Sequence, residues 1–277
     1  MTEFSLLLPV YAGDRAAFLE RAFTSAVREQ TRRPAEVVVV RDGPVPAELA
    51  DRLADLVAAS PVPVTVLPLV RNRGLALALE AGLAACRHDV VARMDADDVS
   101  APHRFAVQLP VVEAGADVVG SALVEFAHDE TEVLAVRTPP LTHEAIAARA
   151  RFHSPFNHPT VVYRRSAVAR AGGYRELPLL EDYWLFARMI ASGARTANVA
   201  EPLVRYRVGA GSYARRGGLR LLRSEVALQR HLHEEGFTTG AQFVRNLVVR
   251  GGYRAVPVGL RRLAYRAVFT RGPRPRP

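Results

Sequence analysis

The chain has 277 residues, of which 49% are hydrophobic and 23% charged, and its formal net charge is +9. Such a composition is typical of a globular protein with a large core, which excludes a disordered chain. No apolar run reaches the ~18–20 residues of a membrane span, and the run Phe4–Val10 is too short for a secretion signal. The single cysteine, Cys86, excludes an internal disulfide or thiolate zinc site, and we expect a buried thiol in a cytoplasmic protein.

The positive charge is concentrated in the C-terminal part of the chain. From Arg205 onwards there are 16 arginines and three acidic residues, whereas the preceding part is slightly acidic. This asymmetry indicates an anionic surface as a partner. The chain contains no lysine, which points to biased codon usage, so each arginine alone is a weak signal.

Apolar runs alternate with amphipathic stretches in the first part of the chain. Near-continuous apolar runs, typical of strands buried on both faces, predict strands over Phe4–Tyr11, Glu36–Gly43, Val64–Leu67 and Val90–Met94. Apolar residues at helical spacing predict helices over Arg15–Glu29, Pro46–Ala59 and Leu75–Ala85. Because short links join them, we predict an α/β fold with a Rossmann-like, doubly wound, mostly parallel sheet.

A polar or turn-forming group lies at the end of each of these four strands. The groups are Pro9-Val10-Tyr11, Asp42, Arg71-Asn72 and Asp95-Ala96-Asp97. Polar loops explain any one of them, but four at one edge of a parallel sheet predict a ligand crevice. Neither G-x-G-x-x-G nor a P-loop motif follows a strand, so phosphate would have to be held by a metal and side chains.

Three carboxylates, those of Asp95, Asp97 and Asp98, follow the fourth strand within four residues. Burying carboxylates is costly unless they are paired, protonated or bound to a cation. Ser100 and Pro102 are predicted to cap and open the next helix, so the acids are not needed as caps. A hard cation with oxygen ligands is the natural partner of this cluster, and a solvated acidic turn is the alternative.

Further strands are predicted over Asp117–Phe126 and Asn157–Tyr163, with a polar surface excursion over Ala127–Pro140 between them. The stretch Leu179–Ile190 is apolar nearly all round and predicts a buried helix that begins with Glu181 and Asp182.

Glu181 and Asp182 are adjacent acids among large apolar side chains. The helix macrodipole favours an acid at an exposed helix start by only ~0.3–1 kcal/mol, which does not explain two adjacent acids among apolar side chains. A carboxylate surrounded by apolar side chains is well placed to act as a general base. We therefore predict that Asp182 is the base and that Glu181 orients an acceptor.

The composition changes after Tyr206. Basic helices are predicted over 219–235, 239–250 and 258–270, which suggests a domain over 1–212 and a basic C-terminal helical region over 213–277. These helices either dock on anionic lipid or carry a solvated arginine face, and we favour peripheral contact with the inner face of the plasma membrane. No nucleic-acid-binding module accompanies the arginines, so no nucleic acid is expected as a partner.

Five motifs in this order resemble family 2 glycosyltransferases of the GT-A fold over roughly residues 4–212. They are Leu8–Tyr11, Asp42-Gly43, Arg71–Gly74, the D-x-D-D of Asp95–Asp98, and Glu181-Asp182. Within the family, Ala92–Asp95, Asn157-His158 and Tyr206–Gly218 resemble bacterial exopolysaccharide and O-antigen enzymes of the amylovoran type. The resemblance implies a nucleoside-diphosphate sugar as donor, Mn²⁺ or Mg²⁺ as cofactor, inversion at the anomeric carbon, and a glycan acceptor, which we expect to be linked to a lipid diphosphate.

The resemblance also implies roles for single residues. Pro9, Val10 and Tyr11 would line the nucleotide pocket, Asp42 would contact the nucleoside base, and Arg71 and Asn72 would lie on the same donor side. Asp95 would hold the ribose and the metal, Asp97 would coordinate the metal, and Asp182 would be the base. His158, Glu181 and Trp184 are expected on the acceptor side.

The chain departs from the family pattern at Gly209, where many relatives have a histidine that reaches the metal or the diphosphate. We expect Arg207, Arg215 and Arg216 to supply positive charge to the diphosphate instead, with solvated surface arginines as the open alternative.

Two other classes are less favoured. A sugar-1-phosphate nucleotidyltransferase requires a glycine-rich basic loop after the first strand, which Ala12-Gly13-Asp14 does not provide. A non-catalytic carbohydrate-binding protein would not need all the acids.

Overall fold

The computed structural model describes residues 2–209 and 219–252. In that part of the chain, one nine-stranded sheet has the order β3-β2-β1-β4-β8-β6-β9-β5, and β7 pairs with β6. The strands are β1 Phe4–Tyr11, β2 Glu36–Asp42, β3 Val64–Pro68, β4 Val90–Arg93, β5 Val99–Ser100, β6 Val118–Phe126, β7 Ala135–Arg137, β8 Val162–Arg164 and β9 Thr196–Arg207. The α-helices are α1 Ala16–Phe23, α2 Ala47–Ala58, α3 Leu75–Ala85, α4 Arg104–Glu113, α5 His143–Ala150, α6 Arg165–Arg170, α7 Glu181–Ala191, α9 Leu219–Glu234 and α10 Gly240–Asn246. Two π-helical turns, η1 Thr24–Arg28 and η3 Leu247–Gly251, extend α1 and α10, and η2 His158–Thr160 is a 3₁₀ turn.

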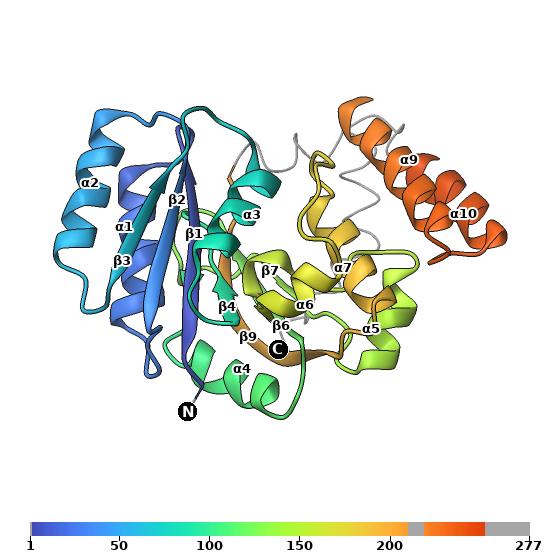
Figure 1. Ribbon diagram of the computed structural model, residues 1–277, viewed down its shortest axis with the longest axis horizontal. Coiled ribbons are helices and arrows are strands. Elements are labelled where there is room, and N and C mark those ends of the chain that lie inside the picture. The colour runs from blue at the N-terminus through green and yellow to red at the C-terminus, as the bar shows by residue number, and fades with distance from the viewer. Residues whose placement is uncertain (1, 210–218, 253–277) are drawn as a thin grey trace, which may run out of the picture.

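The first half of the sheet is parallel, as predicted, and runs β3-β2-β1-β4 (Figure 1). Its strands are buried on both faces: Val37 and Val39 pack in the core under α1 and α2, whereas Val38 and Val40 pack in the core under α3. This two-sided burial explains the continuous valine run of β2. Cys86 is buried just after α3, where the helix ends.

The second half of the sheet is mixed. β8 is antiparallel to both β4 and β6, β9 is parallel to β6, and β5 is antiparallel to β9. The short strand β5 follows the acidic cluster directly and places it beside the end of β9. This non-local pairing is what closes one side of the site.

Two local predictions in this half were wrong. Ser100 does not cap a helix: it lies in β5, where its N–H donates to the Ser25 hydroxyl at 3.0 Å, and α4 begins only at Arg104. The predicted strand Asn157–Tyr163 is largely the turn η2, because Pro159 favours a turn and only Val162–Arg164 pairs with its neighbours. The predicted excursion 127–140 contains β7, which pairs with β6.

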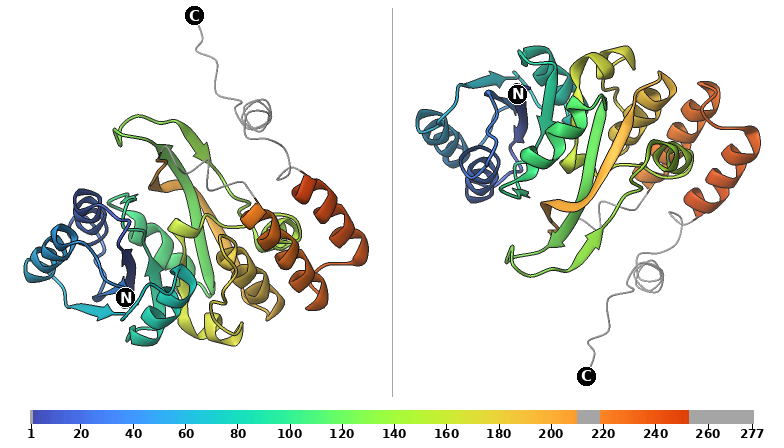
Figure 2. Two further views of the ribbon diagram at one scale, coloured as in Figure 1. Left: turned by 90° about the horizontal axis from the view of Figure 1, so that it is seen from above. Right: turned by 90° about the horizontal axis from the view of Figure 1, so that it is seen from below.

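The predicted helices 219–235 and 239–250 are present as α9 and as α10 with η3. They pack beside α5 and α7, at the end of the molecule opposite α2 and β3 (Figures 1 and 2). Leu221, Leu228 and Leu232 of α9 form one apolar cluster with Tyr183 and Trp184 of α7. The domain boundary at residue 212 lies outside the described residues and stays a prediction. Within the described ranges, no helix is both long enough and apolar enough to cross a bilayer.

Candidate active site

The donor side of the site is formed by the ends of β1 and β2, which lie side by side with Tyr11 paired to Asp42. The Asp42 carboxylate accepts hydrogen bonds from the backbone N–H groups of Arg73 at 2.7 Å and Gly74 at 2.9 Å. Asn72 donates from Nδ2 to the Asp42 carbonyl at 3.3 Å. The turn 71–74 is therefore fastened to the end of β2, which places the two predicted donor-side motifs together.

The loop after β1 folds back on itself. Tyr11 is 43% exposed and lies over Gly13, where an added Cβ would be 2.5 Å from the tyrosine ring, whereas Val10 is buried in the core. The Asp14 carboxylate accepts the Tyr11 N–H at 2.9 Å. Burial, together with the nearby charges of Asp97 and Asp95, raises the pKa of Asp14 to about 7. Asp14 thus belongs to the same acidic environment as the cluster after β4.

The acidic cluster consists of Asp95, Asp97 and Asp98, which each offer a carboxylate oxygen within 4.8 Å of the others. Burial, and then the charge of Asp95, raises the pKa of Asp97 to about 6. Asp98 is fully buried; its Oδ1 accepts the Arg207 N–H at 2.9 Å, but its Oδ2 has no hydrogen-bond partner among the described residues. An all-oxygen donor set with one unsatisfied buried oxygen fits Mn²⁺ or Mg²⁺.

Arg207, at the end of β9, closes one side of this cluster. Its Nε donates to the Asp97 carbonyl at 2.9 Å, and its guanidinium lies over Phe18 at 4.0 Å and Phe126 at 4.4 Å. Arg207 therefore lies where sequence reasoning expected positive charge, although its action on a diphosphate stays a prediction. Arg215 and Arg216 lie outside the described residues.

A charged arginine, Arg93, is buried at the end of β4 and is only 2% exposed. Its Nη2 forms an ion pair with the Asp95 carboxylate, and its backbone carbonyl accepts a hydrogen bond from Arg104 Nη2 at 2.8 Å. Within the described chain, Nε and Nη1 of Arg93 have no hydrogen-bond partner. The positive charge of Arg93 also acts on Glu181 and Asp182, because it lowers the pKa of both carboxyl groups.

Glu181 and Asp182 occupy the first turn of α7, as predicted, and both are partly buried. Burial raises the pKa of Asp182, while the charge of Arg93 lowers it and that of Asp95 raises it further. Burial and the Asp182 charge raise the pKa of Glu181 to about 7. Because Arg93 acts electrostatically on both Asp95 and Asp182, the two groups of acids share one site.

The other predicted acceptor residues are already engaged within the protein. His158 is 8% exposed and shares a hydrogen bond of 2.8 Å between its Nε2 and the Tyr174 hydroxyl. Burial and Arg93 hold the pKa of His158 well below its ordinary value, so the imidazole is neutral. Trp184 is 6% exposed, stacks on His231 with 4.3 Å between ring centroids, and donates from Nε1 to Glu235 at 3.2 Å. Contact of either residue with an acceptor stays a prediction.

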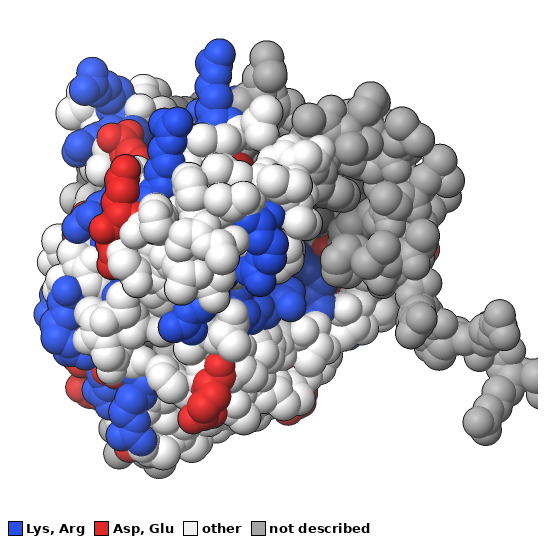
Figure 3. All heavy atoms as spheres, turned by 90° about the vertical axis from the view of Figure 1, so that its right-hand side faces the viewer, with Lys and Arg blue, Asp and Glu red and all other residues white. Residues whose placement is uncertain are grey.

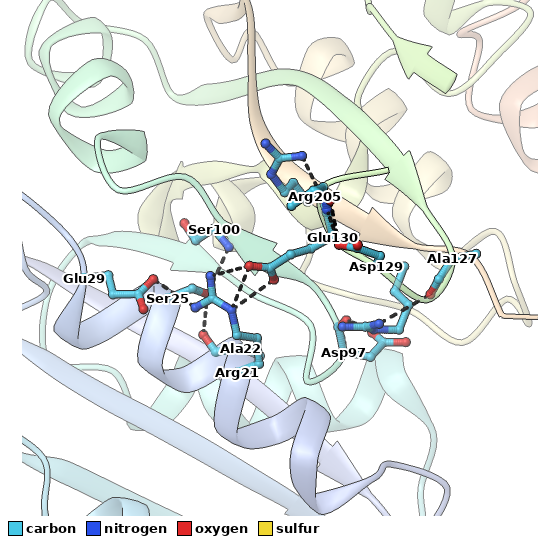
Figure 4. Close-up of polar contacts among 12 residues, drawn as sticks. Arg21, Ala22, Ser25, Glu29, Asp97, Ser100, Ala127, Asp129, Glu130 and Arg205 are labelled. Atoms are coloured by element: carbon cyan, nitrogen blue, oxygen red, sulfur yellow. Dashed lines mark hydrogen bonds and ion pairs between the residues drawn. The ribbon is translucent and has the colours of Figure 1, made fainter. Parts of the chain in front are cut away.

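The loop beside the acidic cluster, residues 127–134, is held against α1 (Figure 4). The Arg21 guanidinium donates from Nε to Glu130 Oε2 at 3.0 Å, and Arg205 of β9 donates from Nη1 to the Glu130 carbonyl at 2.7 Å. Arg207 Nη1 also donates to the Ala127 carbonyl at 3.4 Å. These bonds attach the loop to α1 and β9 next to Asp97.

Sequence reasoning missed Asp14 and Arg93 as site residues, and it placed Asp98 in the acidic cluster without giving it a role of its own. For Arg93 the signal is an arginine inside a strand predicted to be buried. Asp14 carries no local signal, because only the folding of the loop after β1 brings it near Asp95 and Asp97.

Known proteins resemble this chain both in sequence and in fold. A family described as "Glycosyl transferase family 2" matches residues 5–172. The chain is 36% identical over 270 residues to the amylovoran biosynthesis glycosyltransferase AmsE of Erwinia amylovora, covering 95% of this chain and 97% of that protein. It is 31% identical over 271 residues to an Escherichia coli "UDP-Gal:alpha-D-GlcNAc-diphosphoundecaprenol beta-1,3-galactosyltransferase", covering 97% of both.

Solved structures of the same fold include S. aureus TarS 1-349 in complex with UDP, with a TM-score of 0.67, 14% identity, and coverage of 96% of this chain and 79% of that chain. Another is the mannosyltransferase PcManGT from Pyrobaculum calidifontis in complex with GDP-Man and Mn²⁺, with a TM-score of 0.62, 18% identity, and coverage of 99% and 76%. These likenesses confirm the predicted GT-A fold. The chain belongs to glycosyl transferase family 2.

Proposed function

We propose that this glycosyltransferase is a metal-dependent, inverting hexosyltransferase that moves a sugar from a nucleoside-diphosphate sugar to a hydroxyl of a glycan linked to a lipid diphosphate. The observation that carries the proposal is the pairing of two groups of acids around Arg93: an oxygen-rich cluster of Asp95, Asp97 and Asp98, and the Glu181–Asp182 pair. The two relatives named above, an amylovoran biosynthesis glycosyltransferase and a galactosyltransferase named for a diphosphoundecaprenol-linked sugar, support the same class of reaction.

The donor would lie across the ends of β1, β2 and β4, where parallel strands of α/β sheets bind ligands. Asp95 and Asp97 would hold Mn²⁺ or Mg²⁺, and the unsatisfied Oδ2 of Asp98 supports a cation at this position. When bound, the cation would neutralise charge on the diphosphate. Arg207 would add fixed positive charge beside it.

On the acceptor side, Asp182 would act as the general base. Its carboxylate takes the proton of the acceptor hydroxyl while that oxygen attacks the anomeric carbon from one face. The bond from the anomeric carbon to the diphosphate oxygen breaks on the opposite face, and its electron pair leaves with the nucleoside diphosphate. One displacement inverts the configuration. Arg93 favours the ionised form of Asp182, which a base requires.

A thermal-shift screen of nucleotide sugars, with Mn²⁺, Mg²⁺ or a chelator, tests the donor part of this proposal. A bound donor stabilises the folded protein by mass action, by about 2.7 kcal/mol at a concentration of 100 Kd. We expect one nucleoside-diphosphate sugar to raise the melting temperature only in the presence of a divalent metal. A set of nucleotide sugars that all leave it unchanged would contradict the proposal. NMR of the product anomer then decides between inversion and retention.

A further inference from the structure

The segment formed by α10 and η3 presents an apolar face to solvent. Val244 is 58% exposed, Val248 68% and Val249 51%, and these residues recur after one helical turn. The opposite side of the same segment is buried and polar, because Asn246 and Arg250 point toward the body of the protein. The pattern is inverted relative to an ordinary surface helix, which buries its apolar side.

A buried polar network fixes the orientation of this face. Arg250 donates from Nε and Nη2 to the fully buried Glu225 of α9 at 2.6 Å and 2.9 Å, and from Nη1 to the Phe152 carbonyl at 2.9 Å. Asn246 donates from Nδ2 to the Arg151 carbonyl at 2.7 Å and to Gln229 Oε1 at 2.8 Å. Breaking a buried pair of this kind is strongly destabilising, because it leaves a buried charge without a partner. The exposed valines are therefore held at a set position relative to α5.

The same helices contact the element that carries the acid pair. Trp184 of α7 stacks on His231 of α9 and donates to Glu235, directly after the first turn that contains Glu181 and Asp182. The apolar face is thus connected to the acceptor side of the site through α9 and α7. A surface docked on this face would have a defined position relative to the acceptor hydroxyl.

Exposed arginines lie on α9, which packs against α10 and η3, and further arginines follow in the sequence. On α9, Arg220, Arg223 and Arg230 are exposed, and Figure 3 shows more arginine than acid on this end of the molecule. The sequence that follows Gly252, residues 253–277, contains seven arginines and no acidic residue. Basic residues near an anionic bilayer favour attachment, and stable attachment needs such charge together with inserted apolar side chains.

We propose that the face formed by Val244, Val248 and Val249 is the surface by which this protein docks on an anionic lipid bilayer, with the exposed arginines of α9 contacting the headgroups. This inference rests on the proposed function, because a lipid-linked acceptor is presented at a membrane surface. The docked face would set the height of the Glu181–Asp182 pair above the bilayer.

Flotation of the full-length protein with vesicles tests the inference without requiring catalysis. We expect binding to vesicles of phosphatidylethanolamine and phosphatidylglycerol, weak binding to phosphatidylcholine alone, and loss of binding as salt rises. The triple variant Val244→Ser, Val248→Ser, Val249→Ser should bind about tenfold more weakly, because it loses apolar surface that enters the bilayer. All three side chains are more than half exposed, so the variant should fold like the parent.

A matched control is available at another exposed apolar segment, around β7. Val133, Leu134 and Val136 are 53%, 51% and 54% exposed, and changing these three residues to serine should leave flotation unchanged. Absence of flotation by the parent protein, or equal flotation by the α10 variant, would overturn the inference. A parent that is dimeric without lipid, and monomeric in the α10 variant, would assign the face to a second copy of the chain and would equally overturn it.

Donor binding in the thermal-shift screen is independent of this result. A protein that floats but binds no nucleotide sugar would contradict the proposed function and leave the docking surface in place. Turnover with a short, water-soluble acceptor should be the same for the α10 variant and the parent.

Discussion

The two groups of acids in the site differ in how their charge is compensated. Asp95, Asp97 and Asp98 crowd their carboxylates within 4.8 Å and contact Arg93 and Arg207 through an ion pair and hydrogen bonds. Glu181 and Asp182 sit in the first turn of α7, where Arg93 is the arginine that lowers the pKa of both acids. The first arrangement suits a cation, and the second suits a carboxylate that accepts a proton.

Position in the fold, rather than residue type, separates the roles of these acids. In both groups burial raises the pKa. Only the cluster combines close mutual approach with an unsatisfied buried oxygen, that of Asp98 Oδ2 among the described residues. Variants that change one group of acids at a time separate the two roles.

The largest effect is expected for Asp182→Asn. Loss of the base should lower kcat by about 10²–10⁴-fold while the affinity for the donor stays the same, because a general base acts on the reacting proton and not on the nucleotide. Steady-state transfer assays and calorimetry with the donor measure the two effects. Glu176→Gln, at an exposed acid just before α7, is the control and should behave like the parent. Near-normal turnover by the asparagine variant would remove Asp182 from this role.

Asp97→Ala tests the acidic cluster as a metal site. We expect donor affinity in Mn²⁺ to fall by about 10²-fold, with little change in a chelator, because a lost ligand removes the cation's contact with the diphosphate. Calorimetry with and without metal measures the ratio, and Asp129→Ala in the neighbouring loop serves as the control. If the parent binds the donor equally well in Mn²⁺ and in chelator, the acidic cluster is not a metal site.

Arg93 joins the two groups, so its replacement should affect both. In Arg93→Met, the Asp182 carboxylate loses the positive charge that lowers its pKa, so the acidic limb of the pH–rate profile should move to higher pH and turnover at low pH should fall. Arg93→Lys retains the charge and should restore most of the profile. A methionine variant that is less stable but has an unmoved acidic limb would limit Arg93 to a structural role.

The smallest effect concerns the metal-free protein. The pKa values of Asp97, about 6, and Asp14, about 7, lie above the ordinary 3.8. The protonated carboxyl groups of Asp97 and Asp14 therefore contribute fully to the free energy of unfolding below about pH 4. This contribution is lost as the pH rises through 6 to 7. A cation reverses this loss, so Mn²⁺ should raise the melting temperature by a few degrees more at pH 7.5 than at pH 5.5. Differential scanning fluorimetry checks the sign, and a larger gain at pH 5.5 would contradict it.

Much of the parallel half could be predicted from the sequence because its signals are local. The apolar runs of β1 and β2, and the helical spacing of Leu75–Ala85, reproduce the observed bounds closely. The second half was harder: β5 is only two residues long, and it exists because Val99 and Ser100 pair with β9 a hundred residues later. A pattern confined to neighbouring residues carries no information about such pairing.

From the amino-acid order alone, acids follow the ends of predicted buried strands and begin a predicted buried helix, and each needs a partner because burial of charge is costly. Which partners they have depends on how distant segments come together in the fold. Asp14 approaches the cluster because the loop after β1 folds back, and Arg93 links Asp95 to Asp182 because β4 lies at the junction of the parallel and antiparallel halves of the sheet. Electrostatic interactions act through space, and so the chemistry of these acids depends on distances that the chain acquires when it folds.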